Sequence, residues 1–139
     1  MLCSDDVLAH QATIRRVVWL DHEGQEAEVL VELGGQALWA FCHPCDFREQ
    51  EVCAVAFDGL EADISETAFW QENAAQRRAV EPAAGDQWRH HCYGQIQRLH
   101  PVTVACGPLT LALGDRVTDE RAIGAFVYCV MARLDVFRF

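Results

Sequence analysis

Residues 36–45 read Gln-Ala-Leu-Trp-Ala-Phe-Cys-His-Pro-Cys, an apolar and aromatic run that ends in a Cys-x-x-Cys motif. Aromatic residues are enriched in strands, whereas Pro44 has no N–H to donate to a sheet. The run therefore predicts a strand from Gln36 to Cys42. Gly34-Gly35, directly before it, suits a two-residue hairpin turn in which both residues need a positive φ.

The residues before this turn predict the other arm of the hairpin. Glu26–Leu33 alternates between apolar and mainly acidic residues, which indicates a strand with one buried face and one wet face. The wet face carries Glu26, Glu28 and Glu32, and Glu23 lies just before the strand. These four carboxylates, called the acidic face below, are the candidate partner-binding residues.

The rest of the chain predicts further strands and one helix. Ser65 suits a helix N-cap and Glu66 follows it, so we expect a helix near 65–79. Phe126–Val136 alternates throughout and predicts one closing strand. Residues 1–12 have little pattern and are expected to be a loosely ordered lead-in. The other expected strands are Thr13–Leu20, Val52–Phe57, Trp88–Leu99 with a bulge at Gly94, Val102–Cys106 and Leu109–Leu113.

These elements predict a mainly β protein, a small OB-like antiparallel barrel of about seven strands with one helix between its two halves. Successive hairpins must protect their edges, and closure into a barrel does so. The composition, 51% hydrophobic and 23% charged, favours a packed core over disorder. A length of 139 residues suits a single domain, with the barrel over residues 13–139.

Three motifs resemble those of small, uncharacterised bacterial OB-like β-barrel proteins. They are the aromatic strand ending in Cys-His-Pro-Cys (Trp39–Cys45), Tyr93-Gly94-Gln95-Ile96, and Ile123-Gly124-Ala125-Phe126-Val127. The resemblance extends over most of the chain from Thr13 onward. It implies the barrel fold and brings no activity with it.

Net charge and cysteine content indicate the kind of partner and the cellular compartment. The formal charge of −10 repels phosphate backbones and favours a basic protein partner. No apolar run reaches the ~20 residues that span a bilayer, and no signal peptide is recognisable, so we expect a cytoplasmic protein without a membrane partner. Seven cysteines, an odd number, then predict reduced thiols.

Four residues could together form a zinc site. Cys42 and Cys45 have the spacing of half such a site, and His90 and Cys92 share one face of a later strand, which would complete a Cys₃His set. The simpler interpretation is that all four are packed residues and that no cofactor is bound. The Cys-His-Pro-Cys motif is also similar to a thioredoxin-type redox site, but no helix is expected after Cys45 to lower a thiol pKa.

The preferred hypothesis is a non-catalytic protein–protein interaction module that recognises a basic partner with the acidic face. The sequence has no Gly-x-Ser-x-Gly, His-Glu-x-x-His or Gly-x-Gly-x-x-Gly motif and no phosphate-binding loop, so no enzyme activity is expected. The alternatives are the zinc site and single-stranded nucleic acid, which OB-like barrels stack on aromatic side chains. An exposed sheet edge could also pair two chains into a dimer. The aromatic and basic candidates for nucleic acid are Trp19, Trp39, Trp88, Tyr93, Arg89 and Arg98.

Overall fold

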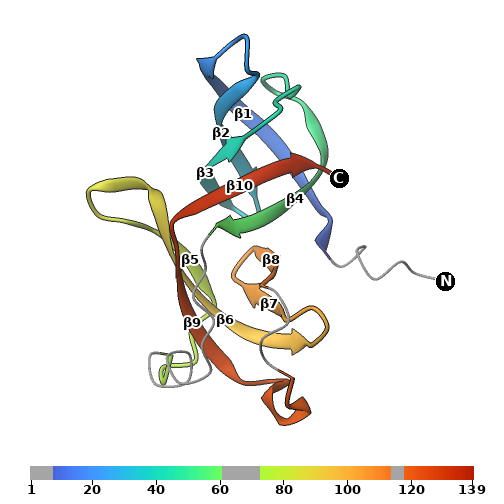
Figure 1. Cartoon of the computed structure of the whole chain (residues 1–139), viewed down its shortest axis with the longest axis vertical. Helices are drawn as coiled ribbons and strands as arrows, with labels where there is room; N and C mark the ends of the chain where they lie inside the picture. Colours follow the sequence, from blue (N-terminus) through green and yellow to red (C-terminus); the bar gives the residue numbers. More distant parts are fainter. Residues whose placement is uncertain (1–7, 61–72, 114–117) are drawn as a thin grey trace, which may run out of the picture.

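The computed structural model describes residues 8–60, 73–113 and 118–139. In these ranges the chain forms ten strands, which divide between a closed barrel and a second sheet (Figure 1). The barrel lies at one end of the molecule and the second sheet at the other. The strands from β5 to β9 are thus an insertion between two strands of the barrel, β4 and β10.

The barrel has five strands in the closed order β1-β2-β3-β10-β4. Their bounds are β1 His10–Asp21, β2 Glu26–Leu33, β3 Gln36–Cys42, β4 Val52–Leu60 and β10 Arg133–Arg138. Most neighbours are antiparallel, and β1 closes the ring by pairing with β4. Strand β10 lies parallel to β3, with Asp135 opposite Phe41.

The second sheet is built around one long strand, β6. Its strands are β5 Ala79–Ala83, β6 Asp86–Arg98, β7 Thr103–Cys106, β8 Leu109–Ala112 and β9 Phe126–Met131. The order is β5-β6-β7-β8, with β9 also antiparallel to β6. A short 3₁₀ turn, Glu120–Ala122, precedes β9, and the Asp119 side chain caps it by accepting a hydrogen bond from the Arg121 N–H.

Alternation along the strands generates one core. In β2 every second residue is buried, from Ala27 to Leu33, and β6 buries alternate residues from His90 to Ile96. Nearly all apolar buried residues of both sheets belong to a single hydrophobic cluster. Burial of apolar area is the dominant stabilising term in folding, so this shared cluster holds the insertion against the barrel.

The central hairpin confirms the prediction made from its sequence. Strands β2 and β3 have the predicted bounds, and the turn residues Gly34 and Gly35 have φ of +56° and +78°. The predicted barrel is confirmed only as a closed five-stranded one. The estimate of about seven strands is wrong because β5–β9 form a separate sheet.

The predicted closing strand Phe126–Val136 is wrong as a single element. The chain bends at Ala132, so β9 belongs to the second sheet and β10 to the barrel. The bend also changes which residues are buried: Val127, Cys129 and Met131 before it, then Leu134 and Val136 after it. Strict alternation across residue 132 is therefore lost, which the sequence pattern does not reveal.

A helix is predicted at 65–79. Its first part, residues 65–72, lies outside the described residues. In the part that is described, Asn73–Ala75 form a turn and Ala79 begins strand β5, so the helix does not continue to 79. The lead-in at 1–12 is wrong at its end, since His10, Gln11 and Ala12 pair with β4. Within the described ranges no helix is long and apolar enough to cross a membrane.

Gly94 and the cysteines also differ from expectation. Cys92 and Cys106 form a disulfide between β6 and β7, in contrast to the reduced thiols expected of a cytoplasmic chain. The pairing of β6 with β9 runs through Gly94 without a shift, so there is no bulge there. Instead, a side chain at Gly94 would collide with Val104 and with the sulfur of Cys106. Glycine at this position leaves the space through which Cys106 reaches Cys92.

Candidate functional site

The first two predicted zinc ligands lie together in the barrel. Cys42 ends β3 and Cys45 follows the turn through Pro44, and both side chains are buried. The Cys42 thiol donates a hydrogen bond of 3.8 Å to the Pro44 carbonyl. Burial, together with the neighbouring Cys45, raises the pKa of Cys42 far above that of a free thiol. A neutral, buried thiol is the result.

The other two predicted ligands have different partners. Cys92 is bonded to Cys106, and the buried His90 ring uses Nδ1 for a 2.9 Å hydrogen bond with the Trp88 carbonyl. Burial also lowers the pKa of His90. Across 8–60, 73–113 and 118–139, no three His, Cys, Asp or Glu side chains gather where a metal could bind. The structure thus places Cys42 with Cys45 and does not bring His90 and Cys92 to them.

The Cys-His-Pro-Cys segment also lacks the surroundings of a redox site. A reactive thiol needs a lowered pKa, which helix N-termini or nearby cations provide. Cys42 lies at a strand end, and the chain after Cys45 leads through a short connection to strand β4. The raised pKa of Cys42 points to a packing role in the barrel core.

The acidic face lies on the outer side of the barrel, as its alternation predicted. Glu26, Glu28 and Glu32 project from β2 opposite the buried residues, and Glu23 is exposed in the turn before it. Glu32 accepts two hydrogen bonds of 2.9 Å from Arg15 on β1, and this guanidinium lowers the pKa of Glu32. In the described part of the chain, Glu23 and Glu28 have no side-chain partner.

The pairing register extends this face around the barrel. Val18 of β1 is opposite Glu28, Glu28 is opposite Phe41 of β3, and Phe41 is opposite Asp135 of β10. Asp135 in turn is opposite Asp58 of β4. One row across the five strands therefore carries three carboxylates and two apolar side chains. The row joins the β1–β2 hairpin to the side of the barrel nearest β10.

The β1–β2 hairpin adds exposed apolar surface next to these carboxylates. Val18, Trp19 and Leu20 are 37%, 37% and 49% exposed. The Trp19 ring is steadied by a stacked contact with His22 at 4.9 Å between centroids. Apolar residues bordered by charged ones are typical of protein interaction surfaces.

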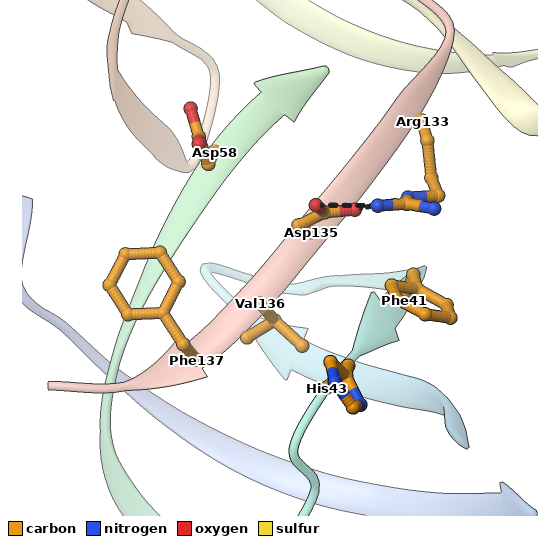
Figure 2. Close-up of a pocket in the computed structure, with 7 residues that line it drawn as sticks. All are labelled: Phe41, His43, Asp58, Arg133, Asp135, Val136 and Phe137. Atoms are coloured by element: carbon orange, nitrogen blue, oxygen red, sulfur yellow. Dashed lines mark hydrogen bonds and ion pairs between the residues drawn. The ribbon is translucent and has the colours of Figure 1, made fainter. Parts of the chain in front are cut away.

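Near β10 the barrel surface is hollowed into a pocket of about 180 Å³, called the Asp58 pocket here. Figure 2 shows Arg133 directed at Asp135, with Phe41 beside the guanidinium and His43, Asp58 and Phe137 around them. Arg133 donates to Asp135 at 2.6 and 3.0 Å and lies 4.0 Å from the Phe41 ring centre.

Sequence reasoning missed this pocket. Arg133, Asp135 and Phe137 alternate with Leu134 and Val136, which is a signal that the former point outward. The sequence does not say that β10 joins the barrel beside β3 and β4. That pairing is what brings His43 and Asp58 to the same hollow.

The candidates for nucleic-acid binding are dispersed. Trp19 lies on the hairpin, Trp39 is on the outer face of β3 with Arg16 5.8 Å away, and Trp88 contacts Phe41 edge to face. Tyr93 lies on the second sheet. Arg89 forms an ion pair with Asp86, and Arg98 donates to the Thr103 hydroxyl. No single described groove collects them.

Comparison with protein-family models, with curated protein sequences and with solved structures finds no match to this chain.

Proposed function

We propose that this protein is a non-catalytic binding module that recognises a basic protein through the outer face of β2 and the β1–β2 hairpin. The observation that carries the proposal is that Glu23 and Glu28 have no side-chain partner among the described residues and that the exposed Val18 lies directly opposite Glu28, with the exposed Trp19 and Leu20 following on the same hairpin. Apolar contact supplies affinity in such a surface, while charge selects and steers the partner.

The architecture supports the choice of face. A closed five-stranded barrel is the form of an OB-type fold, in which the face of the second and third strands and the adjoining loops bind ligands. Here that face is lined by Glu26, Glu28 and Glu32. Carboxylates there repel phosphates and attract Lys and Arg, so a basic protein is the better ligand.

The thiols support a non-catalytic role. A nucleophilic cysteine must be accessible and partly ionised at neutral pH. Cys42 and Cys45 are 2% and 1% exposed, and the pKa of Cys42 is raised.

The test is affinity capture with the full chain, compared with a Glu26→Gln/Glu28→Gln variant. We expect a basic protein to be captured at about 50 mM salt and released at about 500 mM, because salt screens exposed charges. The variant should capture much less of it. Binding of the purified partner is then measured by calorimetry with both forms.

Glu120→Gln is the matched control, because Glu120 is an exposed carboxylate beyond the barrel. It should capture as much partner as the original chain. Capture that is insensitive to salt, or equal for all three forms, contradicts the proposal.

One observation favours single-stranded nucleic acid as a second candidate. On the outer side of the second sheet, Tyr93 packs on Tyr128 at 4.9 Å, and the Arg77 guanidinium lies 4.3 Å from the Tyr93 ring centre. Aromatic rings beside arginine can stack bases. Fluorescence polarisation with labelled oligonucleotides at low salt tests this candidate, and a flat titration rejects it.

A further inference from the structure

We propose that the Asp58 pocket and the hollow beside it form a two-part site for a short basic-apolar segment of the partner, in which an Arg or Lys side chain enters the Asp58 pocket. This inference rests on the proposed function and names the residue types that the basic partner would present.

The first argument is an uncompensated charge. Asp58 and Asp135 are direct cross-strand neighbours on β4 and β10, and like charges in that position destabilise a sheet. Arg133 compensates Asp135 with two hydrogen bonds. Asp58 is exposed and, among the described residues, has no side-chain partner. A cation that enters the pocket would supply the missing counter-charge.

The second argument is the nature of the walls. Phe41, His43 and Phe137 line the pocket together with the two carboxylates. Aromatic rings attract cations through their negative faces, and Arg133 already uses Phe41 in this way. A volume of about 180 Å³ is below the range of small-molecule sites and fits one side chain.

The third argument is the adjoining hollow, about 380 Å³, which shares Phe41 and Arg133 with the pocket. Its other walls are Leu60, Trp88 and Ala132, so its lining is mainly apolar. Leu60 is 40% exposed. Trp88 comes from the second sheet, and this hollow therefore lies where the two sheets meet. An apolar side chain close to the cation in the partner's sequence would fill it.

The test is a titration of the nitrogen-15-labelled full chain with the peptide acetyl-Gly-Arg-Gly-Leu-Gly-amide, followed by NMR. We expect saturable shifts at the amides of residues that line the two hollows, on β10 and at residues 41–43, 58–60, 88 and 132. Replacing Arg by citrulline, its neutral isostere, should weaken binding about fivefold, which corresponds to a partly exposed ion pair. Replacing Leu by Ser should weaken it as well.

Asp58→Asn should bind the Arg peptide no better than the original chain binds the citrulline peptide. Glu120→Gln should bind the Arg peptide as the original chain does. The site is refuted if shifts do not saturate, if Arg and citrulline peptides bind equally, or if Asp58→Asn has no effect. It is also refuted if shifts appear only on β1 and β2.

The two proposals fail separately. If Glu26→Gln/Glu28→Gln loses partner capture and no peptide binds at β10, the acidic face is supported as the binding surface and the pocket proposal is rejected. Peptide binding at β10 without any effect of Glu26 and Glu28 on capture would retain the pocket and reject the acidic face.

Discussion

The barrel and the second sheet differ in what they expose and in what holds them together. Among the described residues, Glu28 and Asp58 of the outer barrel row have no side-chain partner, whereas on the second sheet His91 and Tyr93 both contact Tyr128. The Cys92–Cys106 disulfide lies in the second sheet, whereas Cys42 and Cys45, which are buried in the barrel, are free thiols. The proposed recognition surface therefore lies on the barrel, where these two carboxylates are unpaired among the described residues, and not on the second sheet.

The difference in covalent cross-linking follows from the length of the strands. Strands β7 and β8 have four residues each, and a hairpin of that size is barely stable by itself. A cross-link from β6 to this hairpin compensates for its small contact area. Barrel closure through β1 and β4 leaves no free edge, so the barrel has less need of a covalent link.

The largest expected effect is loss of the disulfide. Cys92→Ala/Cys106→Ala should lower the free energy of unfolding by about 3 kcal/mol, the value for a loop of this length. Hydrogen exchange should accelerate in β6–β8 more than in β1–β4. Chemical denaturation and exchange mass spectrometry measure the two effects.

Cys53→Ala is the control, since Cys53 is a half-buried free thiol in the barrel. It should change exchange in the second sheet little. A titration that finds seven free thiols in the unreduced, unfolded chain would contradict the disulfide.

Gly94→Ala should lower the free energy of unfolding by a smaller amount. The added methyl group would meet Val104, Cys106 and the Ala105 carbonyl, and overpacking of this kind costs about 2 kcal/mol. Gly24→Ala in the barrel hairpin is the comparison, because there the nearest atom is the movable carboxylate of Asp21 at 2.9 Å. It should change stability by less than about 0.5 kcal/mol. Equal effects in thermal melts would show that the close approach at Gly94 is unimportant.

The last effect is a gradual dependence of stability on mild acid. Burial lowers the pKa of His10 and of His90, so the folded chain binds fewer protons than the unfolded chain just below pH 6.5. Stability should be complete above that pH and fall as the pH decreases, by at most about 1.4 kcal/mol per pH unit for each histidine. Denaturation midpoints between about pH 7 and pH 5 measure the slope.

His10 connects the two regions, because its Nε2 accepts a 2.9 Å hydrogen bond from the Thr110 N–H of β8. His10→Asn keeps an acceptor and does not titrate, so it should remove the part of the slope that His10 contributes and leave the part that His90 contributes. The carboxylates held by arginine, such as Glu51, have lowered pKa values and titrate at lower pH. A slope unchanged by His10→Asn would exclude His10 as its source.

The sequence predicted most strands of both regions closely, including β6, β7 and β8 of the second sheet, but it predicted neither strand β5 nor how the strands pair beyond the β2–β3 hairpin. Glu26–Leu33 and Gln36–Cys42 are local patterns joined by a turn that two glycines determine. Strand β5 contains Pro82, which has no N–H to donate to a sheet, and no strand is predicted there from the sequence; pairing with the long strand β6 holds it in the sheet. Such strand pairing depends on residues elsewhere in the chain, so the sequence of the strand itself carries no pattern that predicts it.

The candidate site also has a part that the sequence predicts and a part that it does not. The outward direction of Glu26, Glu28 and Glu32 follows from alternation along one strand. The Asp58 pocket requires β3, β4 and β10 to lie side by side, and the disulfide requires β6 to lie beside β7. Both are products of tertiary pairing, which a single sequence does not encode in any short window.

The insertion of the second sheet has a consequence for folding. Strands β1–β4 follow one another along the chain, but the gap between β3 and β4 is filled only by β10, which comes after the whole insertion. Its first residue, Arg133, pairs with Leu60, the last residue of β4. Closure must therefore bring together segments that are distant in sequence, and such non-local pairing slows folding. Until it happens, β3 and β4 present unsatisfied backbone groups to other chains, so a slow-folding intermediate prone to self-association is expected at the moment before β10 docks.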